Sequence, residues 1–284
     1  AEVGQANPHA LLHGLVGTEI AVEILGTDPW TARMLLADRY RNGRIFLAGD
    51  AAHLNPPWGG HGFNTGIGDA VNIGWKLAAV LEGWGGDGLL ASYEAERRSI
   101  AERTIREAAL NMSVLAPDLG NAEMLASGLV GEEARQAAAQ AIRISKDREF
   151  HSLGLVLGYQ YAASPVIVDD GTPPLSEGQN YEPTAQPGAR LPHLWLPDEA
   201  SLYDRLGSGL SLLQLRDDAA VSPFIEAAAA RKVPLTVIEL HGQAPEELYG
   251  APLLLVRPDQ HVAWRGASVD QATAETIIDR VRGV

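Results

Sequence analysis

Residues 45–64, IFLAGDAAHLNPPWGGHGFN, change character abruptly along their length. The stretch begins as a short apolar segment of the kind that forms a buried strand, and it continues into a loop rich in glycine and proline that leads to a helix. A strand, a glycine-rich turn and a helix start bring free backbone N–H groups together, and the helix dipole makes this place attractive to negative charge. A structural turn without a ligand remains an alternative, because short glycine-rich motifs often match by chance.

The side chains of this loop suit a flat ligand. Three residues without a Cβ let such a ligand approach the backbone closely, namely Gly59, Gly60 and Gly62. Pro56 and Pro57 stiffen the loop and remove two N–H donors. Asp50, at the end of the apolar segment, is a hydrogen-bond acceptor suited to a sugar-like hydroxyl, whereas Asp69 is equally consistent with a surface charge or a first-turn charge of the helix.

Composition limits the kinds of protein to consider. The chain has 284 residues, 46% hydrophobic and 20% charged, which is typical of a globular protein with room for two domains. A net charge of −14 argues against nucleic-acid binding. The absence of cysteine excludes disulfides, thiolate catalysis and zinc or iron–sulfur sites built on thiolates, and we expect no metal site. No apolar run approaches the roughly 20 residues of a membrane helix, so we expect no membrane span. A soluble chain without cysteine fits the cytoplasm, which is the location we expect.

Hydrophobic spacing predicts the elements of the first 165 residues. It indicates strands over 17–25 and 44–49 and a mostly helical segment over 116–165. Further helices are expected over 29–43, 64–83 and 87–115. Gly83 is the expected C-cap of the second helix. One face of that helix holds the apolar set Ile67, Ala70, Val71, Gly74, Leu77, Ala78 and Leu81. We interpret the alternating Glu and Arg of the third helix as a solvated face.

The composition shifts after residue 164. Residues 164–192 are rich in proline and glycine and are expected to form an extended linker, with a domain boundary near 185. Beyond the linker the pattern predicts strands over 209–216 and 234–240, helices over 222–232 and 268–283, and a hairpin from 251–259 and 261–266. Ser268 is the expected N-cap of the last helix. This order is typical of a small α/β domain.

Two stretches carry a resemblance to a known family. Residues 43–83, GRIFLAGDAAHLNPPWGGHGFNTGIGDAVNIGWKLAAVLEG, and residues 89–98, LLASYEAERR, resemble the second FAD-binding signature of the flavin-dependent aromatic hydroxylases of the para-hydroxybenzoate hydroxylase class. The resemblance implies an α/β fold in which this part of the chain is the C-terminal part of an FAD-binding, Rossmann-type hydroxylase domain.

The resemblance also implies roles for the loop residues. Asp50 is expected to bind the ribityl chain of FAD. The residues implied to lie beside the isoalloxazine ring are Pro57, Gly59 and Gly60. The residues implied to offer backbone N–H groups to the pyrimidine edge of the ring are Gly62, Phe63 and Asn64, and a helix start there would stabilise the negative charge of reduced flavin.

Some positions depart from the family pattern. Asn55 and Trp58 stand where relatives more often have His and a smaller residue, and Trp58, with Pro57, is our candidate for the catalytic position beside the ring. His61 occupies a variable position, and we expect it to contact the cofactor through its backbone. His53 is expected to be structural.

The C-terminal region resembles the thioredoxin-like domain of the phenol and polyketide hydroxylase subset, on PGARLPHLWL (187–196) and LLLVRPDQHVAWRG (253–266) among other segments. Without cysteines this domain is expected to be structural or dimer-forming, with Arg257, Asp259 and Trp264 as fold residues. The implied domains are a remnant of the substrate-binding sheet (1–30), the C-terminal part of the FAD-binding domain with a helical extension (31–165), a linker (166–186) and the thioredoxin-like domain (187–284).

The implied function is an FAD-dependent monooxygenase that hydroxylates a phenolic or polyketide-type aromatic ring with NADH or NADPH and O2. No GxGxxG fingerprint follows a strand upstream of the loop, so we expect a fragment that is inactive alone and requires the N-terminal portion of the same protein. The alternative is a non-catalytic flavoprotein remnant or an assembly module. A small aromatic substrate and a homodimer are the other expected partners; phenols, hydroxylated aromatic acids and polyketide rings all remain candidate substrates.

Overall fold

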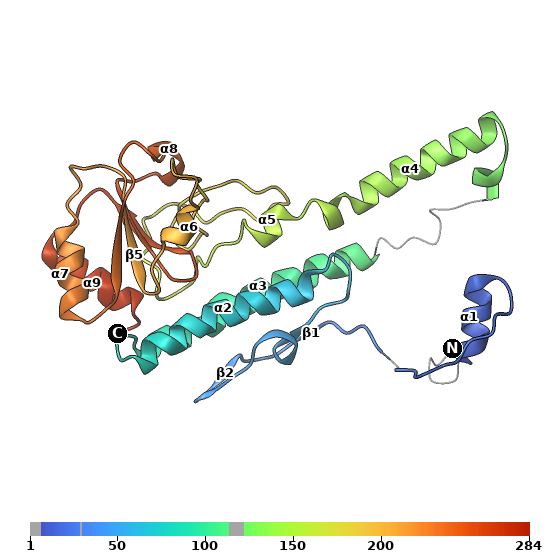
Figure 1. Ribbon diagram of the computed structural model, residues 1–284, viewed down its shortest axis with the longest axis horizontal. Coiled ribbons are helices and arrows are strands. Elements are labelled where there is room, and N and C mark those ends of the chain that lie inside the picture. The colour runs from blue at the N-terminus through green and yellow to red at the C-terminus, as the bar shows by residue number, and fades with distance from the viewer. Residues whose placement is uncertain (1–6, 29, 114–121) are drawn as a thin grey trace. The chain divides into compact units, whose positions relative to one another are not determined.

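The computed structural model describes residues 7–28, 30–113 and 122–284 (Figure 1). The chain divides into two compact units, Ala1–Arg33 and Met34–Val284. The described part of the first unit contains one helix, α1 (Pro8–Val16), which the sequence analysis missed; Asn7 caps it by accepting a hydrogen bond from the backbone N–H of His9. The strand expected over 17–25 is absent there, because an alternating pattern forms a strand only where a second strand can pair with it.

The second unit begins with two small antiparallel ribbons. Strand β1 (Leu35–Leu36) pairs with β4 (His53–Leu54), and β2 (Arg41–Asn42) pairs with β3 (Ile45–Phe46). The prediction of a helix over 29–43 is therefore wrong for its described residues. Gly43 and Arg44 form the two-residue turn of the β2–β3 hairpin, and Gly43 adopts a left-handed φ of +59°. A glycine at the first position of such a turn favours a hairpin over continued helical spacing. The strand expected over 44–49 shortens to the two residues of β3.

Helices α2 (His61–Leu81) and α3 (Asp87–Ser113) pack along each other (Figure 1). Helix α2 starts three residues earlier than predicted, and Gly83 follows its end in a left-handed conformation, as expected for a C-terminal glycine. The described part of the third predicted helix is confirmed.

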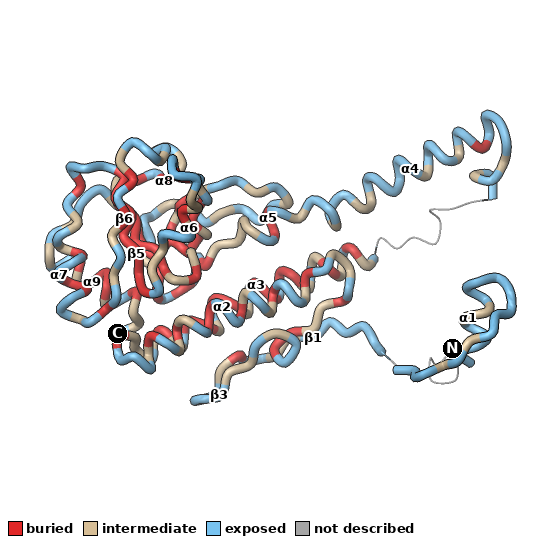
Figure 2. The backbone as a smooth tube through the Cα atoms, in the orientation of Figure 1, coloured by how far each residue is buried: buried red, intermediate tan, exposed pale blue. Residues whose placement is uncertain are grey.

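Helix α2 has buried and exposed residues along its length (Figure 2). Most of the buried residues are polar, and much of the apolar side faces outward. Ile67, Val71 and Leu81 are 46%, 50% and 85% exposed. Five of the buried residues of the same helix are polar, namely His61, Thr65, Asp69, Asn72 and Lys76. The apolar set identified by periodicity is thus largely not the surface that α2 buries in this chain.

The segment after α3 is helical in part. The described elements are a short 3-10 turn at Ala122–Leu125, helix α4 (Leu129–Phe150) and helix α5 (Leu153–Val156). Residues 116–121 of the predicted helical segment lie outside the described residues, and residues 158–165 are not helical. The predicted linker, 166–186, has no regular secondary structure.

The C-terminal elements form a four-stranded sheet with the order β6-β5-β7-β8. Its strands are β5 (Leu210–Gln214), β6 (Leu235–Glu239), β7 (Leu253–Val256) and β8 (Val262–Gly266). The first pair is parallel and the others are antiparallel, so the predicted hairpin is confirmed.

Helices cover both faces of this sheet (Figure 1). Helices α7 (Ser222–Ala230) and α9 (Gln271–Val281) contribute to the core on one face, where Phe224 packs against Trp264. Helices α6 (Leu202–Arg205) and α8 (Glu246–Tyr249), which were not predicted, contribute to the core on the other face. The predicted N-cap Ser268 is wrong: Asp270 caps α9, because its carboxylate is the group that accepts a hydrogen bond from the backbone N–H of Thr273.

A buried cluster of charges joins α3 to the C-terminal sheet. Glu96 accepts two hydrogen bonds from Arg257, at 2.6 and 2.8 Å, and Arg257 also pairs with Asp259 beside the β7–β8 turn. Three further donors reach the same carboxylate, namely Lys76, Asn72 and Ser164. The interpretation of α3 as a helix whose Glu and Arg face solvent is therefore wrong at its centre. No local pattern could have revealed this, because the partner of Glu96 lies 161 residues away.

We expect Glu96→Gln to lower the free energy of unfolding of this chain by about 3–5 kcal/mol, since it leaves the buried Arg257 and Lys76 without their shared anion. Glu102→Gln is the matched control, because Glu102 is exposed on the same helix and the same substitution should change stability by no more than about 0.5 kcal/mol. Urea unfolding followed by circular dichroism measures both. Equal effects of the two substitutions would contradict the assignment.

Candidate functional site

A tight turn follows β3 and lies against helix α2. Residues Gly49–Ala51 form a 3-10 turn, and Gly49 adopts a left-handed φ of +57°. The backbones of Gly49 and Gly66 are so close that a Cβ on Gly66 would lie 3.2 Å from the Cα of Gly49. The backbone N–H of Gly49 donates to the carboxylate of Asp69 at 3.0 Å. The position of the turn is therefore set by α2.

Asp69 is the centre of a buried hydrogen-bond network. Its Oδ2 lies 2.9 Å from Nε2 of His53, and its Oδ1 accepts from Nε of Arg97 at 2.8 Å. Burial alone would raise the pKa of Asp69, but the hydrogen bond from His53 and the charge of Arg97 outweigh it and lower that pKa. The interpretation of Asp69 as a surface or first-turn charge is wrong, and the expectation that His53 is structural fits its full burial.

Arg97 occupies space that Gly68 leaves free. A Cβ on Gly68 would lie 2.7 Å from Nη2 of Arg97. The same Nη2 donates to the backbone oxygen of Thr65, and Nη1 donates to the hydroxyl of Tyr161 at 3.1 Å. The guanidinium is thus held on three sides and has little freedom to move aside.

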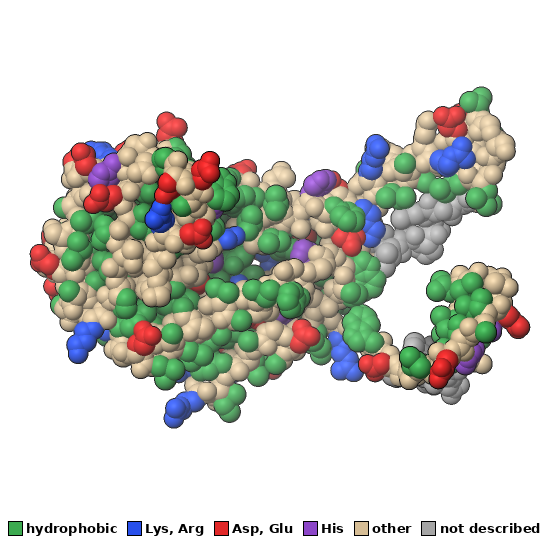
Figure 3. Space-filling view, in the orientation of Figure 1, with side chains coloured by type: hydrophobic (Ala, Val, Ile, Leu, Met, Phe, Trp, Pro, Cys, Tyr) green, Lys and Arg blue, Asp and Glu red, His purple; other side chains and the backbone are tan. Residues whose placement is uncertain are grey.

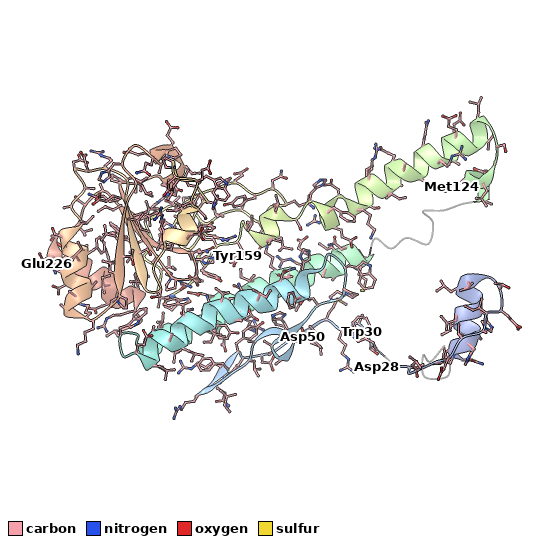
Figure 4. The ribbon with its side chains drawn as sticks, viewed as in Figure 1. Asp28, Trp30, Asp50, Met124, Tyr159 and Glu226 are labelled. Carbon is pink, nitrogen blue, oxygen red and sulfur yellow. The ribbon has the colours of Figure 1, made fainter. Side chains whose placement is uncertain are left out.

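Asp50 differs from its buried neighbours. It lies on the turn beside α2, and Figure 4 labels it there. Its side chain is exposed and makes no hydrogen bond or ion pair with any part of the chain that the structure describes. A carboxylate that is held in place through its backbone and left free at its oxygens can accept hydrogen bonds from the hydroxyls of a ligand.

The loop between β4 and α2 depends on its glycines. Gly59 and Gly60 have φ values of +86° and +66°, which side chains with a Cβ rarely adopt. Pro57 is exposed and Trp58 is half-buried. The backbone N–H of Gly59 donates to Glu149 of α4 at 3.3 Å, a contact that the sequence analysis did not predict.

The start of α2 offers free backbone donors. Among the residues of the first turn, His61, Gly62 and Phe63 have N–H groups with no acceptor inside the helix. Phe63 is 78% exposed, and the side chain of Asn64 donates to the backbone oxygen of Gly60. The helix start is therefore open to a ligand that carries negative charge or acceptor atoms.

His61 points away from solvent. Burial lowers the pKa of His61 below its usual value, with Glu107 and Glu149 opposing the shift, so the ring is neutral at pH 7. Its ring lies close against Gly59, and its Nε2 has no hydrogen-bond partner among the described residues. A polar cavity of about 280 Å³ adjoins it, lined also by Arg103 and Arg148. The side chain of His61 thus faces the protein interior. Only its backbone N–H, at the start of α2, is placed to contact a ligand at the loop.

The structure brings most of the predicted site residues to one loop and helix start. The residues that sequence reasoning missed lie behind them, namely Asp69, Arg97 and Glu149. Asp69 and Asn72 share a face of α2 with Lys76, at spacings of three and four residues. This row of polar residues, opposite the apolar one, was the sequence pattern that could have indicated a buried polar network around Asp69. In the described ranges no group of three or more His, Asp or Glu side chains could hold a metal ion. No described helix is long and apolar enough to span a bilayer.

Comparison with known proteins places the chain in context. Residues 4–108 match the FAD binding domain family, and residues 184–283 match the aromatic-ring hydroxylase, C-terminal family. An FAD-dependent monooxygenase of Emericella nidulans is 36% identical over 96% of this chain and 47% of its own length. Phenol 2-monooxygenase of a Pseudomonas species is 32% identical over 96% of this chain and 51% of its own length.

A solved structure supports the same relationship. The rebeccamycin biosynthetic enzyme RebC with reduced flavin superimposes with a TM-score of 0.86 at 39% identity, over 99% of this chain and 53% of that chain. The chain thus spans about half the length of the relatives it matches. These findings confirm both resemblances and the predicted fold class, an FAD-binding part followed by a cysteine-free thioredoxin-like domain.

We expect Gly68→Ala to destabilise this chain by about 1–2 kcal/mol, because the new methyl group crowds the buried guanidinium of Arg97 by more than the gain in helix propensity offsets. Gly74→Ala is the matched control on the same helix, since a Cβ there meets no atom within 4 Å. That substitution should stabilise the chain by about 0.5–1 kcal/mol. Thermal unfolding of the two variants distinguishes them, and a stabilised Gly68→Ala would contradict the packing described.

Proposed function

We propose that this chain, a member of the FAD-dependent aromatic-ring hydroxylase family, forms the flavin-ring side of the active site of a monooxygenase that hydroxylates a phenolic or polyketide-type ring with NADH or NADPH and O2. The observation that carries the proposal is the pairing of an exposed, unpartnered Asp50 with the open N-terminus of α2. The family matches and the names of the relatives support it.

The residues present fit an FAD. In this proposal Asp50 accepts hydrogen bonds from the ribityl hydroxyls. The free backbone N–H groups of Gly62 and Phe63 face the pyrimidine edge of the ring, where the helix dipole stabilises negative charge. The N–H of Asn64, also expected there from the resemblance, is the first to find its acceptor inside the helix. When bound, FAD supplies the oxygen-transfer chemistry, and the protein contributes orientation, electrostatics and exclusion of water.

The loop between β4 and α2 would form the surface against the flavin ring. Gly59 and Gly60 bring backbone rather than side chains to that surface, and the exposed ring of Pro57 adds a rigid apolar face. Trp58 is the side chain available to narrow the substrate space or to stack on an aromatic ring. The substrate we propose is a small aromatic compound with at least one ring hydroxyl.

The exposed apolar face of α2 supports a specific partner. Phe63, Ile67, Val71 and Leu81 leave large apolar side chains in solvent, and Figure 3 shows hydrophobic side chains gathered over this part of the chain. Because the chain spans about half the length of its relatives, we propose that the dinucleotide-binding half of the same protein covers this face. The homodimer, the cytoplasmic location and the domain boundaries predicted from the sequence stay predictions.

FAD binding by the complete encoded protein tests the function. Titration followed by quenching of flavin fluorescence should show a complex, and Asp50→Ala should raise the dissociation constant about 10- to 100-fold, the equivalent of losing hydrogen bonds to a charged group. Asp38→Ala is the matched control, since Asp38 is exposed and lies outside the loop. A complete protein that binds no flavin would refute the proposal and favour a non-catalytic remnant.

Substitution on α2 tests the partner surface. Val71→Lys should change the free energy of unfolding of this chain alone by no more than about 0.5 kcal/mol, because the residue is half exposed here. In the complete protein the same substitution should cost about 2 kcal/mol or more, since it buries a charge at an apolar interface. Chemical unfolding of both forms makes the comparison. An equally small effect in the complete protein would show that this face stays in solvent.

A further inference from the structure

Two adjacent residues of α3 hold different parts of the second unit. Glu96 binds Arg257 beside the β7–β8 turn, as described above. Arg97 binds Asp69, the residue that holds the backbone of Gly49. Neighbouring side chains on a helix point about 100° apart, so α3 presents one of these residues to the C-terminal sheet and the other to the turn that carries Asp50.

Tyr161 connects the second of these contacts to the C-terminal sheet. Its hydroxyl accepts a hydrogen bond from Arg97 at 3.1 Å, and its ring stacks on His261 with 4.3 Å between ring centroids. Its backbone N–H donates to the oxygen of Gly188 at 2.9 Å. His261 in turn places Nδ1 2.9 Å from the backbone oxygen of Asp259. Tyr161 is thus fixed by the C-terminal domain on one side and touches Arg97 on the other.

The contacts form a continuous path from the C-terminal domain to the turn. The path runs through Tyr161, Arg97 and Asp69 to the N–H of Gly49, which directly precedes Asp50. Every side chain on it is buried, with Tyr161 3%, Arg97 1% and Asp69 0% exposed. Loss of the Tyr161 hydroxyl would leave one nitrogen of a buried guanidinium unpaired, and the guanidinium would shift to recover a partner. A shift of Arg97 weakens its hydrogen bond to Asp69, and a less firmly held Asp69 binds the backbone N–H of Gly49 less tightly.

We propose that the cysteine-free C-terminal domain braces the turn that carries Asp50, with Tyr161 and Arg97 as positioning residues for FAD. The proposal rests on the proposed function only in the identity of the ligand. It gives the domain a task that needs no redox chemistry: the domain holds Arg97, and Arg97 holds the turn in the conformation that binds the cofactor.

The first experiment measures the turn without FAD. In the flavin-free complete protein, Tyr161→Phe should accelerate amide hydrogen exchange at Gly49 about tenfold, the effect of weakening one charge-assisted hydrogen bond on local opening. Tyr249→Phe is the matched control, because it also removes a buried hydroxyl, one that donates to the backbone oxygen of Pro192 inside the C-terminal domain at 3.1 Å. That variant should leave exchange at Gly49 unchanged, even where both variants unfold at lower temperature.

The second experiment measures the cofactor. In the complete protein, Tyr161→Phe should raise the FAD dissociation constant about 3- to 10-fold, whereas Tyr249→Phe should not change it. A wild-type protein that binds no FAD would refute the proposed function, and exchange at Gly49 would still decide whether the brace exists. Unchanged exchange at Gly49 in Tyr161→Phe would overturn the brace. So would an unchanged FAD affinity in that variant when the wild type binds FAD.

Discussion

The buried pairing of Glu96 with Arg257 is the interaction on which the arrangement of the second unit depends. Removing two charges from water is costly, and their attraction offsets that cost only where the remaining donors and acceptors also find partners. Lys76 and Ser164 help to meet this condition by donating to the same carboxylate. Burial alone would raise the pKa of Glu96, but the charges of Arg257 and Lys76 lower it, so the carboxylate is ionised at neutral pH. An apolar contact tolerates small shifts, whereas a shift here leaves charged atoms unpaired; the cluster therefore fixes how the C-terminal sheet sits on α3.

This cluster also explains why α2 is oriented as it is. Lys76 and Asn72 must face α3 to reach Glu96, and Asp69 faces the same way to meet Arg97. Because these positions are three and four residues apart, they take one side of the helix and turn Ile67 and Val71 to the opposite side. A helix normally buries its apolar side. Here the polar side is used within the chain, and much of the apolar side is left exposed, which is why we propose a partner surface for it.

The sequence predicted what depends on local chemistry. The strands and helices beyond residue 209 were predicted well, because each carries its own amphipathic pattern and turn residues, although Asp270 rather than Ser268 proved to be the cap. The loop of residues 45–64 was recognisable because its glycines and prolines set the local backbone conformation, which does not depend on distant partners. The errors concern partners distant in sequence. The strand expected over 17–25 has no second strand to pair with in the described residues. Glu96 was interpreted as a solvent-facing charge because no residue near it in the sequence indicates its distant partner Arg257.

The adjacency of Glu96 and Arg97 has a physical consequence for the whole site. A single turn of α3 carries the attachment of the C-terminal domain and the attachment of the Gly49 turn, so neither can move without disturbing the other. Because packed interiors resist deformation, a displacement of the C-terminal sheet would be passed through α3 to the Gly49 turn. This chain has no cysteine, so thiol–disulfide chemistry cannot be the task of the C-terminal domain. The role that we propose for the domain is therefore mechanical. The C-terminal sheet fixes α3 through Arg257, and α3 fixes through Arg97 and Asp69 the turn that carries the exposed carboxylate of Asp50.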